Sequence, residues 1–187
     1  MVMAMSLSAS VWRVVRPACV AGVLTLAALT LTSGRGTLAA VEVSEAQVKA
    51  AFLYKFASFI EWPGTSVGPI TIAVAGDDGF EEILAHAVRG QSLKGREFRT
   101  RRLTRTDDPC DCHMLYVSAA RPNDAAEMLG RVQGPVLTVG ETPRFLRDGG
   151  MVRFYIEDKK IRFQIHQKNA EAAGLKISSQ LLALSAR

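Results

Sequence analysis

Polar side chains that could bind a ligand follow the first apolar run of the predicted domain. Asp77 and Asp78 come directly after Pro69 to Ala75, a short apolar stretch typical of a buried parallel strand. The carboxyl ends of such strands form the edge of an α/β sheet at which ligands usually bind. A metal site there requires a further acid after the third predicted strand, Cys112 to Val117, but that strand is followed by Ser118 and two alanines. We expect one aspartate to cap the next helix, and a small-molecule receptor or enzyme using Asp77, Asp78 and Ser118 is the alternative function.

Other residues of the kinds used in catalysis lack the spacing that catalysis or metal binding requires. The three histidines are far apart in the sequence, and Cys110 to His113 is too crowded for a tetrahedral zinc site. Gly76 to Gly79 does not match a phosphate-binding loop, and its two acids would repel phosphate. Ser178-Ser179 has no paired base nearby and fits a helix cap better than a nucleophile. These motifs therefore indicate no catalytic, metal or cofactor site, and the alternative at Asp77, Asp78 and Ser118 stays open.

The first 40 residues have the layout of a secretory signal peptide. Arg13 and Arg16 form a positive start, Ala18 to Leu31 carries no charge, and small residues lead to a predicted cleavage site after Ala40. The apolar run is about 14 residues long, short of the roughly 20 that a membrane-spanning helix requires. An uncleaved anchor is the alternative. We expect an exported protein, with residues 41–187 as the mature domain.

Removal of this leader changes the charge of the chain. The leader contains three arginines and no acid, so the net charge falls by three, from +5 to +2. The five arginines between Arg96 and Arg105 alternate poorly with aromatic residues. An exposed strand whose like charges discourage edge-to-edge pairing explains this run better than a binding patch. The sequence therefore gives no support for a nucleic-acid partner.

Cys110 and Cys112 are the only cysteines after the predicted leader. Two residues apart in an extended chain, their Cα atoms are about 6.5–7 Å apart, at the limit of disulfide geometry. The periplasm is oxidising and still favours pairing. We predict either a strained, easily reduced bridge between them or a covalent dimer through one exposed thiol.

An aromatic-rich segment, Val48 to Pro63, opens the mature chain. Ser44 and Gln47 form a capping box, and Pro63 restricts the residue before it, which predicts a helix from Glu45 to about Glu61. Lys49 intrudes into the apolar side of this helix and is expected to snorkel to water. The core-facing stripe consists of Val48, Phe52, Leu53, Phe56, Phe59 and Ile60.

The other side of the predicted helix carries few charges for an exposed surface. Tyr54, Ser58, Glu61 and Trp62 lie there. Either the C-terminal helices cover this side, or a partner does. Amphipathic aromatic residues are favoured at surfaces that are buried only part of the time. We predict that these four residues contact a partner protein or a second copy of the chain.

Strands and helices alternate through the middle of the chain, which implies a parallel sheet covered on both faces. The C-terminal part differs, because Met151 to Glu157 and Lys160 to His166 alternate apolar and polar residues. A turn at Asp158-Lys159 places Phe154 opposite Phe163 and puts every apolar residue on one face. The predicted fold is a single three-layer α/β domain, mostly parallel, with helices on both faces and a C-terminal antiparallel hairpin.

Both ends of the mature chain resemble the YfiR family of small periplasmic proteins. The resemblance rests on Val48 to Pro63, on "AGDDGF" and "CHMLYV", and on the final stretch from Gly149 to Arg187. It implies a compact α/β protein without catalytic activity. The best-understood members of the family restrain a membrane-bound diguanylate cyclase by binding its periplasmic sensor domain. An outer-membrane lipoprotein of the OmpA-like class can sequester the restraining protein, which connects envelope stress to cyclic di-GMP and biofilm formation.

This sequence departs from the regulatory members in its thiols. The resemblance implies two disulfides in those members, but Ala73 stands here at the position of a cysteine in their first strand. The fold and broad role therefore carry over, and the disulfide pattern does not. The implied partner is the periplasmic domain of an inner-membrane diguanylate cyclase or another sensor. An OmpA-like outer-membrane lipoprotein and a second copy of the chain are further candidates.

Overall fold

The structure is a computed structural model that describes residues 44–64, 67–76, 79–104, 106–119 and 122–185. Asp77, Asp78 and the predicted cleavage site after Ala40 lie outside these residues. No helix in the described part of the chain is long and apolar enough to cross a membrane.

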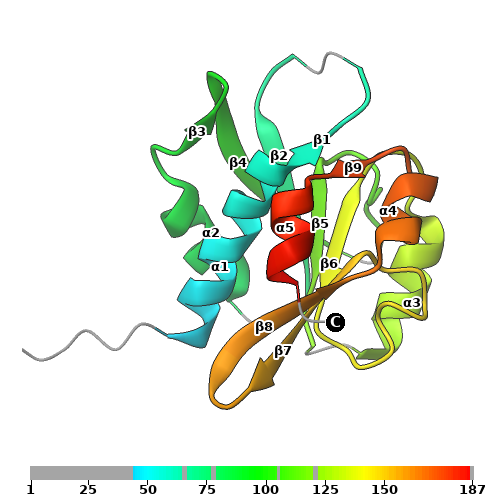
Figure 1. Cartoon of the computed structure of the whole chain (residues 1–187). Coiled ribbons are helices and arrows are strands. Elements are labelled where there is room, and N and C mark those ends of the chain that lie inside the picture. Colours follow the sequence, from blue (N-terminus) through cyan, green and yellow to red (C-terminus); the bar gives the residue numbers. More distant parts are fainter. Residues whose placement is uncertain (1–43, 65–66, 77–78, 105, 120–121, 186–187) are drawn as a thin grey trace, which may run out of the picture. The chain divides into compact units, whose positions relative to one another are not determined.

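A mostly parallel sheet of seven strands forms the centre of the domain, in the order β3-β4-β2-β5-β6-β7-β8 (Figure 1). The neighbours from β4 to β7 are parallel, whereas β3 and β8 pair antiparallel at the two edges. The strands in chain order are β2 (Ile70–Ala75), β3 (Ser92–Leu93), β4 (Arg96–Leu103), β5 (Met114–Val117), β6 (Leu137–Gly140), β7 (Val152–Glu157) and β8 (Lys160–Ile165).

Helices cover both faces of this sheet, as the uninterrupted apolar strands require. Along β2, Ile72 and Val74 belong to one core cluster, and Ala73 and Ala75 belong to another. The first cluster contains residues of α1, α2, α4 and α5, and the second contains residues of α3. The predicted single three-layer α/β domain is therefore confirmed. The helices are α1 (Glu45–Phe56), α2 (Phe80–Val88), α3 (Pro122–Arg131), α4 (Gln167–Ala172) and α5 (Ser179–Leu184).

The C-terminal hairpin has the predicted register. Phe154 lies opposite Phe163, and the turn residues Asp158 and Lys159 have φ values of 50° and 59°. Two consecutive residues with positive φ match the tight turn that joins twisted antiparallel strands. The rings of Phe154 and Phe163 are buried, and both pack against Phe56 of α1 at centroid distances of 5.7 and 5.1 Å. Most of the aromatic surface of α1 thus serves the core.

The opening helix is shorter than predicted. The capping box at Ser44 is present, but α1 ends at Phe56, and a 3₁₀ turn, η1 (Ala57–Phe59), follows. The next residues form strand β1 (Ile60–Glu61), which pairs antiparallel with β9 (Lys176–Ile177). The prediction of a helix to Glu61 is wrong because this pairing with a segment more than a hundred residues away outweighs local helix propensity.

Candidate partner-binding surface

The four residues predicted to contact a partner come from three successive elements. Tyr54 lies in α1, Ser58 in η1, Glu61 in β1, and Trp62 directly follows β1. Ser58 and Glu61 are exposed, whereas Tyr54 and Trp62 are half-buried. The expectation that all four share one helix face is therefore wrong, because the chain leaves the helix after Phe56.

Tyr54 packs against the sheet. Its ring meets Phe98 of β4 edge to face, with centroids 6.1 Å apart. The ammonium group of Lys55 lies 5.6 Å from the centre of the same ring, a cation–π contact. Tyr54 is thus partly a core residue, and only part of its surface is available to a partner.

Trp62 lies at the end of the sheet where the parallel strands begin. Its indole Nε1–H donates to the backbone oxygen of His113 at 3.3 Å, and its ring meets the imidazole edge to face at 6.0 Å. His113 immediately precedes β5, and Arg96 is the first residue of β4. We call Trp62, Arg96, His113 and Thr71 the amino-edge cluster.

The imidazole of His113 is surrounded by donors. Its Nδ1 accepts the backbone N–H of Thr71 at 3.2 Å, and the guanidinium of Arg96 lies 2.8 Å from Nε2. Burial and the positive charge of Arg96 lower the pKa of His113 below its ordinary value. The ring is therefore neutral at pH 7, and added positive charge on it would be repelled by Arg96.

Sequence reasoning identified Trp62 but not its partner His113, nor Arg96, which contacts His113. These three residues are separated by 17 to 51 positions, so no local pattern connects them. The topology could have connected Arg96 and His113. Arg96 begins β4 and His113 precedes β5, and parallel strands begin at the same edge of a sheet.

The two thiols occupy different environments in the loop before β5, and neither is in a disulfide. Cys112 donates to the oxygen of Pro109 at 3.3 Å, and burial raises its pKa to about 12. The sulfur of Cys110 accepts the N–H of Gln133 at 3.1 Å and donates to the oxygen of Arg131 at 3.5 Å. Of the two, Cys110 is the better candidate for thiol chemistry, because the thiolate of Cys112 is strongly disfavoured.

The opposite, carboxyl edge of the sheet contains a network of ionisable side chains. Lys49 pairs with Glu141 at 2.9 Å and also with Glu45, and Tyr116 donates to Glu141. Burial opposes the charge on Lys49, but the hydrogen bonds to Glu45 and Glu141 outweigh it, so the pKa of Lys49 is raised. Lys49 does not snorkel freely to water, because only 12% of its side chain is exposed. We call Lys49, Glu141 and Tyr116 the carboxyl-edge network.

This carboxyl edge leaves little room for a ligand in the described part of the chain. Ser118 is buried, and its N–H donates to Ala75 at 2.9 Å. A Cβ on Gly76 would lie 2.7 Å from Cβ of Ser118, so glycine permits this close approach. The cavity beside Lys49 and Tyr116 measures about 210 Å³. Among the described residues, no three histidine, cysteine or acidic side chains gather to hold a metal ion.

A family model described as YfiR/HmsC-like matches residues 46–186 of the chain, which is nearly the whole described domain. The chain belongs to the YfiR/HmsC-like family. Membership suggests a periplasmic regulator of cyclic di-GMP signalling, with a regulatory role rather than a catalytic one. A comparison with curated proteins found no match.

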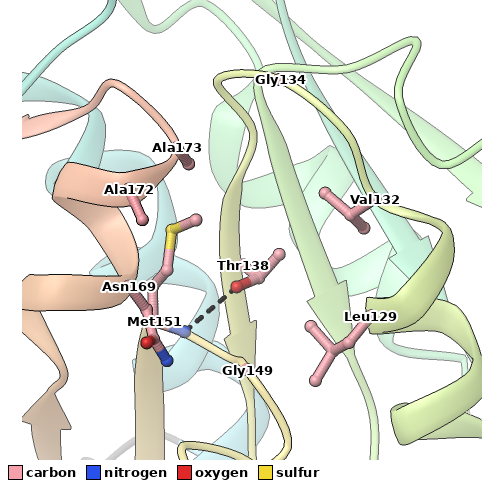
Figure 2. Close-up of a pocket in the computed structure, with 9 residues that line it drawn as sticks. All are labelled: Leu129, Val132, Gly134, Thr138, Gly149, Met151, Asn169, Ala172 and Ala173. Atoms are coloured by element: carbon pink, nitrogen blue, oxygen red, sulfur yellow. Dashed lines mark hydrogen bonds between the residues drawn. The ribbon is translucent and has the colours of Figure 1, made fainter.

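A second cavity of this YfiR/HmsC-like domain, about 310 Å³, lies between α3 and α4 (Figure 2). Its polar side chains already hold the neighbouring backbone: Thr138 accepts the N–H of Met151 at 3.1 Å, and Asn169 donates to Gly150 at 2.7 Å. The residues that line it are Leu129, Val132, Gly134, Thr138, Gly149, Met151, Asn169, Ala172 and Ala173. None of these is ionisable, so the cavity has the makeup of a structural hollow and not of a catalytic site.

Proposed function

We propose that this protein is a non-catalytic periplasmic regulatory binding protein. It restrains an inner-membrane signalling protein, a diguanylate cyclase or another sensor, by binding its periplasmic domain, and so limits cyclic di-GMP and biofilm formation. The observation that supports this most strongly is the YfiR/HmsC-like match across residues 46–186. The predicted leader, with cleavage after Ala40, supplies the route to the periplasm.

The surface around Tyr54 and Trp62 is the proposed contact with the sensor. Both side chains combine a large apolar ring with a polar atom, a combination enriched at interfaces. Both are half-buried, so their remaining area is available, and the exposed Ser58 and Glu61 lie between them in the chain. A partner would cover these rings and pair with the polar groups around them.

Two further partners belong to this proposal. An OmpA-like outer-membrane lipoprotein would release the cyclase by sequestering the protein. A homodimer would arise if a second copy occupied the same surface. Either occupant competes with the sensor, so regulation follows from mutually exclusive binding.

Affinity capture tests the proposed function. Protein spanning residues 41–187 is immobilised and exposed to detergent extracts of the envelope, and the bound proteins are identified by mass spectrometry. We expect an inner-membrane protein that carries a diguanylate cyclase domain. Failure to retain any inner-membrane signalling protein, while the immobilised protein stays folded, would refute the proposal.

The same capture locates the surface. The double variant Tyr54→Ala/Trp62→Ala should lose the partner, whereas Tyr155→Ala should retain it. Tyr155 is a matched control because it is also a half-buried tyrosine with a cation–π contact, to Arg153 at 5.2 Å, but lies on β7. Equal capture by all three proteins would leave the function standing and show that the surface lies elsewhere.

A further inference from the structure

The imidazole of His113 faces more hydrogen-bond donors than it can accept from. The backbone N–H of Thr71 lies 3.2 Å from Nδ1, and the guanidinium of Arg96 lies 2.8 Å from Nε2. A neutral imidazole has one acceptor nitrogen, and an imidazolium has none. The ring therefore satisfies one of these two donors when it is neutral and neither of them when it is protonated.

The backbone of His113 is held independently of its ring. Its N–H donates to the oxygen of Thr71 at 2.9 Å, and its own oxygen accepts the N–H of Leu137 at 3.0 Å. These bonds tie the residue to β2 and β6, the two neighbours of β5 in the sheet. The residue is half-buried, so a ring that turns outward reaches water. The ring can thus leave its place without a change in the strands.

Arg96 is the charged residue that meets the ring in the described part of the chain. The other two side-chain or backbone neighbours, Thr71 of β2 and Trp62 after β1, carry no charge. The guanidinium of Arg96 is anchored, because its Nε donates to the oxygen of Gly68 at 2.6 Å. Burial and this fixed positive charge lower the pKa of His113. A ring that has left the cluster therefore binds a proton more readily than one inside it.

The other ionisable side chains near this site are occupied or neutral. Asp111, in the loop before β5, pairs with Arg101 at 3.2 Å. The next residue, Cys112, has its pKa raised to about 12 by burial and stays uncharged. Glu61 precedes Trp62 in the chain, but it is exposed and lies opposite Lys176 of β9. Arg96 is thus the group that decides how the cluster responds to a proton.

We propose that His113 is a proton-operated switch of the amino edge. In its neutral form the ring lies between Arg96 and Trp62. On protonation it turns toward water, so the Thr71 N–H loses its side-chain acceptor and Trp62 loses the edge-to-face contact at 6.0 Å. Acid therefore adds a positive charge to the amino edge and loosens the packing of its tryptophan. This inference does not depend on the proposed regulatory function, since it follows from contacts within the chain.

Nuclear magnetic resonance during a titration from about pH 7.5 to about pH 5 tests the switch. We expect the His113 ring, the Thr71 amide and the Trp62 indole N–H to change together, with one midpoint below about 6.5, the ordinary value for histidine. One pH unit below that midpoint the released form should outnumber the held form about tenfold. The Leu137 amide, which bonds to the backbone of His113, should stay unchanged. A Leu137 amide that moves with the others would show a change of the strands and overturn the proposal.

Substitutions test the role of the two charges. Arg96→Gln removes the charge that repels the protonated ring, so the midpoint should rise toward about 6.5. Arg99→Gln, at an exposed position of the same strand, is the matched control and should leave the midpoint unchanged. His113→Gln should abolish the joint titration, whereas His86→Gln, at an exposed position of α2, should preserve it. A joint titration that persists in His113→Gln, or a midpoint that Arg96→Gln does not raise, would contradict the switch.

Discussion

The two ends of the parallel strands, the carboxyl edge and the amino edge, use their polar side chains differently. At the carboxyl edge, where α/β sheets usually bind ligands, Lys49, Glu141 and Tyr116 bond to one another and are largely buried. At the amino edge, Trp62 is half-buried, and so is Tyr54, which packs on Phe98 near the start of β4. Among the described residues, the polar side chains of the carboxyl edge thus bond to one another, whereas the amino edge presents a partly open aromatic surface.

This contrast bears on function. A catalytic or ligand-binding α/β protein keeps its ionisable groups free to meet a substrate. Here the carboxyl-edge network is occupied internally, so the half-buried aromatics at the other edge become the stronger candidates for recognition. A regulator that binds another protein requires a surface of that kind rather than a reactive centre.

Loss of Glu141 should have the largest effect on stability. Glu141→Ala leaves the ammonium of Lys49 and the hydroxyl of Tyr116 without this acceptor, and we expect the free energy of unfolding to fall by about 2–4 kcal/mol. Denaturant unfolding followed by circular dichroism measures this change. Glu157→Ala is the control, because Glu157 forms an exposed pair with Arg162 at 3.7 Å and should cost at most about 1 kcal/mol. Equal losses would show that the carboxyl-edge network is not a closed structural unit.

Substitution of Trp62 should have a smaller effect. Trp62→Phe keeps an aromatic ring but removes the Nε1–H that donates to His113, and we expect a loss of about 0.5–1.5 kcal/mol in the free energy of unfolding. Thermal unfolding provides the measurement. A loss as large as that of Glu141→Ala would mean that Trp62 is a core residue and that the contrast between the edges fails.

Acidification should disturb the amino edge before the rest of the domain. The folded state lowers the pKa of His113, so the unfolded chain binds the proton more readily, and stability falls as pH drops below the unfolded value of about 6.5. Trp12 belongs to the predicted leader, so Trp62 is the only tryptophan of the expected mature chain, and its fluorescence reports on its His113 neighbour. We expect the emission to change below pH 6.5 in the parent protein and to stay flat in His113→Gln. An identical titration in both proteins would exclude His113 as the cause.

The thiols should have the smallest effect on the fold. A bridge between Cys110 and Cys112 closes a very short loop and adds little stability, and burial disfavours the Cys112 thiolate. We therefore expect oxidation to give a disulfide-linked dimer through Cys110, visible on non-reducing electrophoresis and absent from Cys110→Ser but present in Cys112→Ser. Two free thiols in freshly isolated periplasmic protein would contradict this expectation and the alternative of a local bridge.

The parts of the fold that sequence reasoning predicted are those with repeated local patterns. The continuous apolar strand around Ile72 indicates burial on both faces, which predicts the layers. The alternation around Phe154 shows which side chains share a face, which predicts the register of the hairpin. The early end of α1 could not be read in this way, because it depends on the pairing of Ile60 with Ile177. Two-residue strands such as β1 and β9 are too short to carry a pattern of their own.

The candidate surface was predictable only in part. The unusual composition of the opening segment singled out Tyr54 and Trp62, but it could not show that Tyr54 packs on Phe98. Glu141 is not identifiable from the sequence, because nothing near it suggests a partner and its bond to Lys49 spans 92 positions. Contacts of this range are set by the packing of α1 on the sheet and not by local chemistry.

The most direct test of the central claim is the level of cyclic di-GMP in cells that lack the protein and are complemented with exported variants. The account predicts that the deletion raises cyclic di-GMP, that the parent protein and Tyr155→Ala restore a low level, and that the folded double variant Tyr54→Ala/Trp62→Ala does not. A deletion that leaves cyclic di-GMP unchanged would contradict the regulatory function. A double variant that lowers it as well as the parent protein does would contradict the assignment of Tyr54 and Trp62 to the regulatory surface.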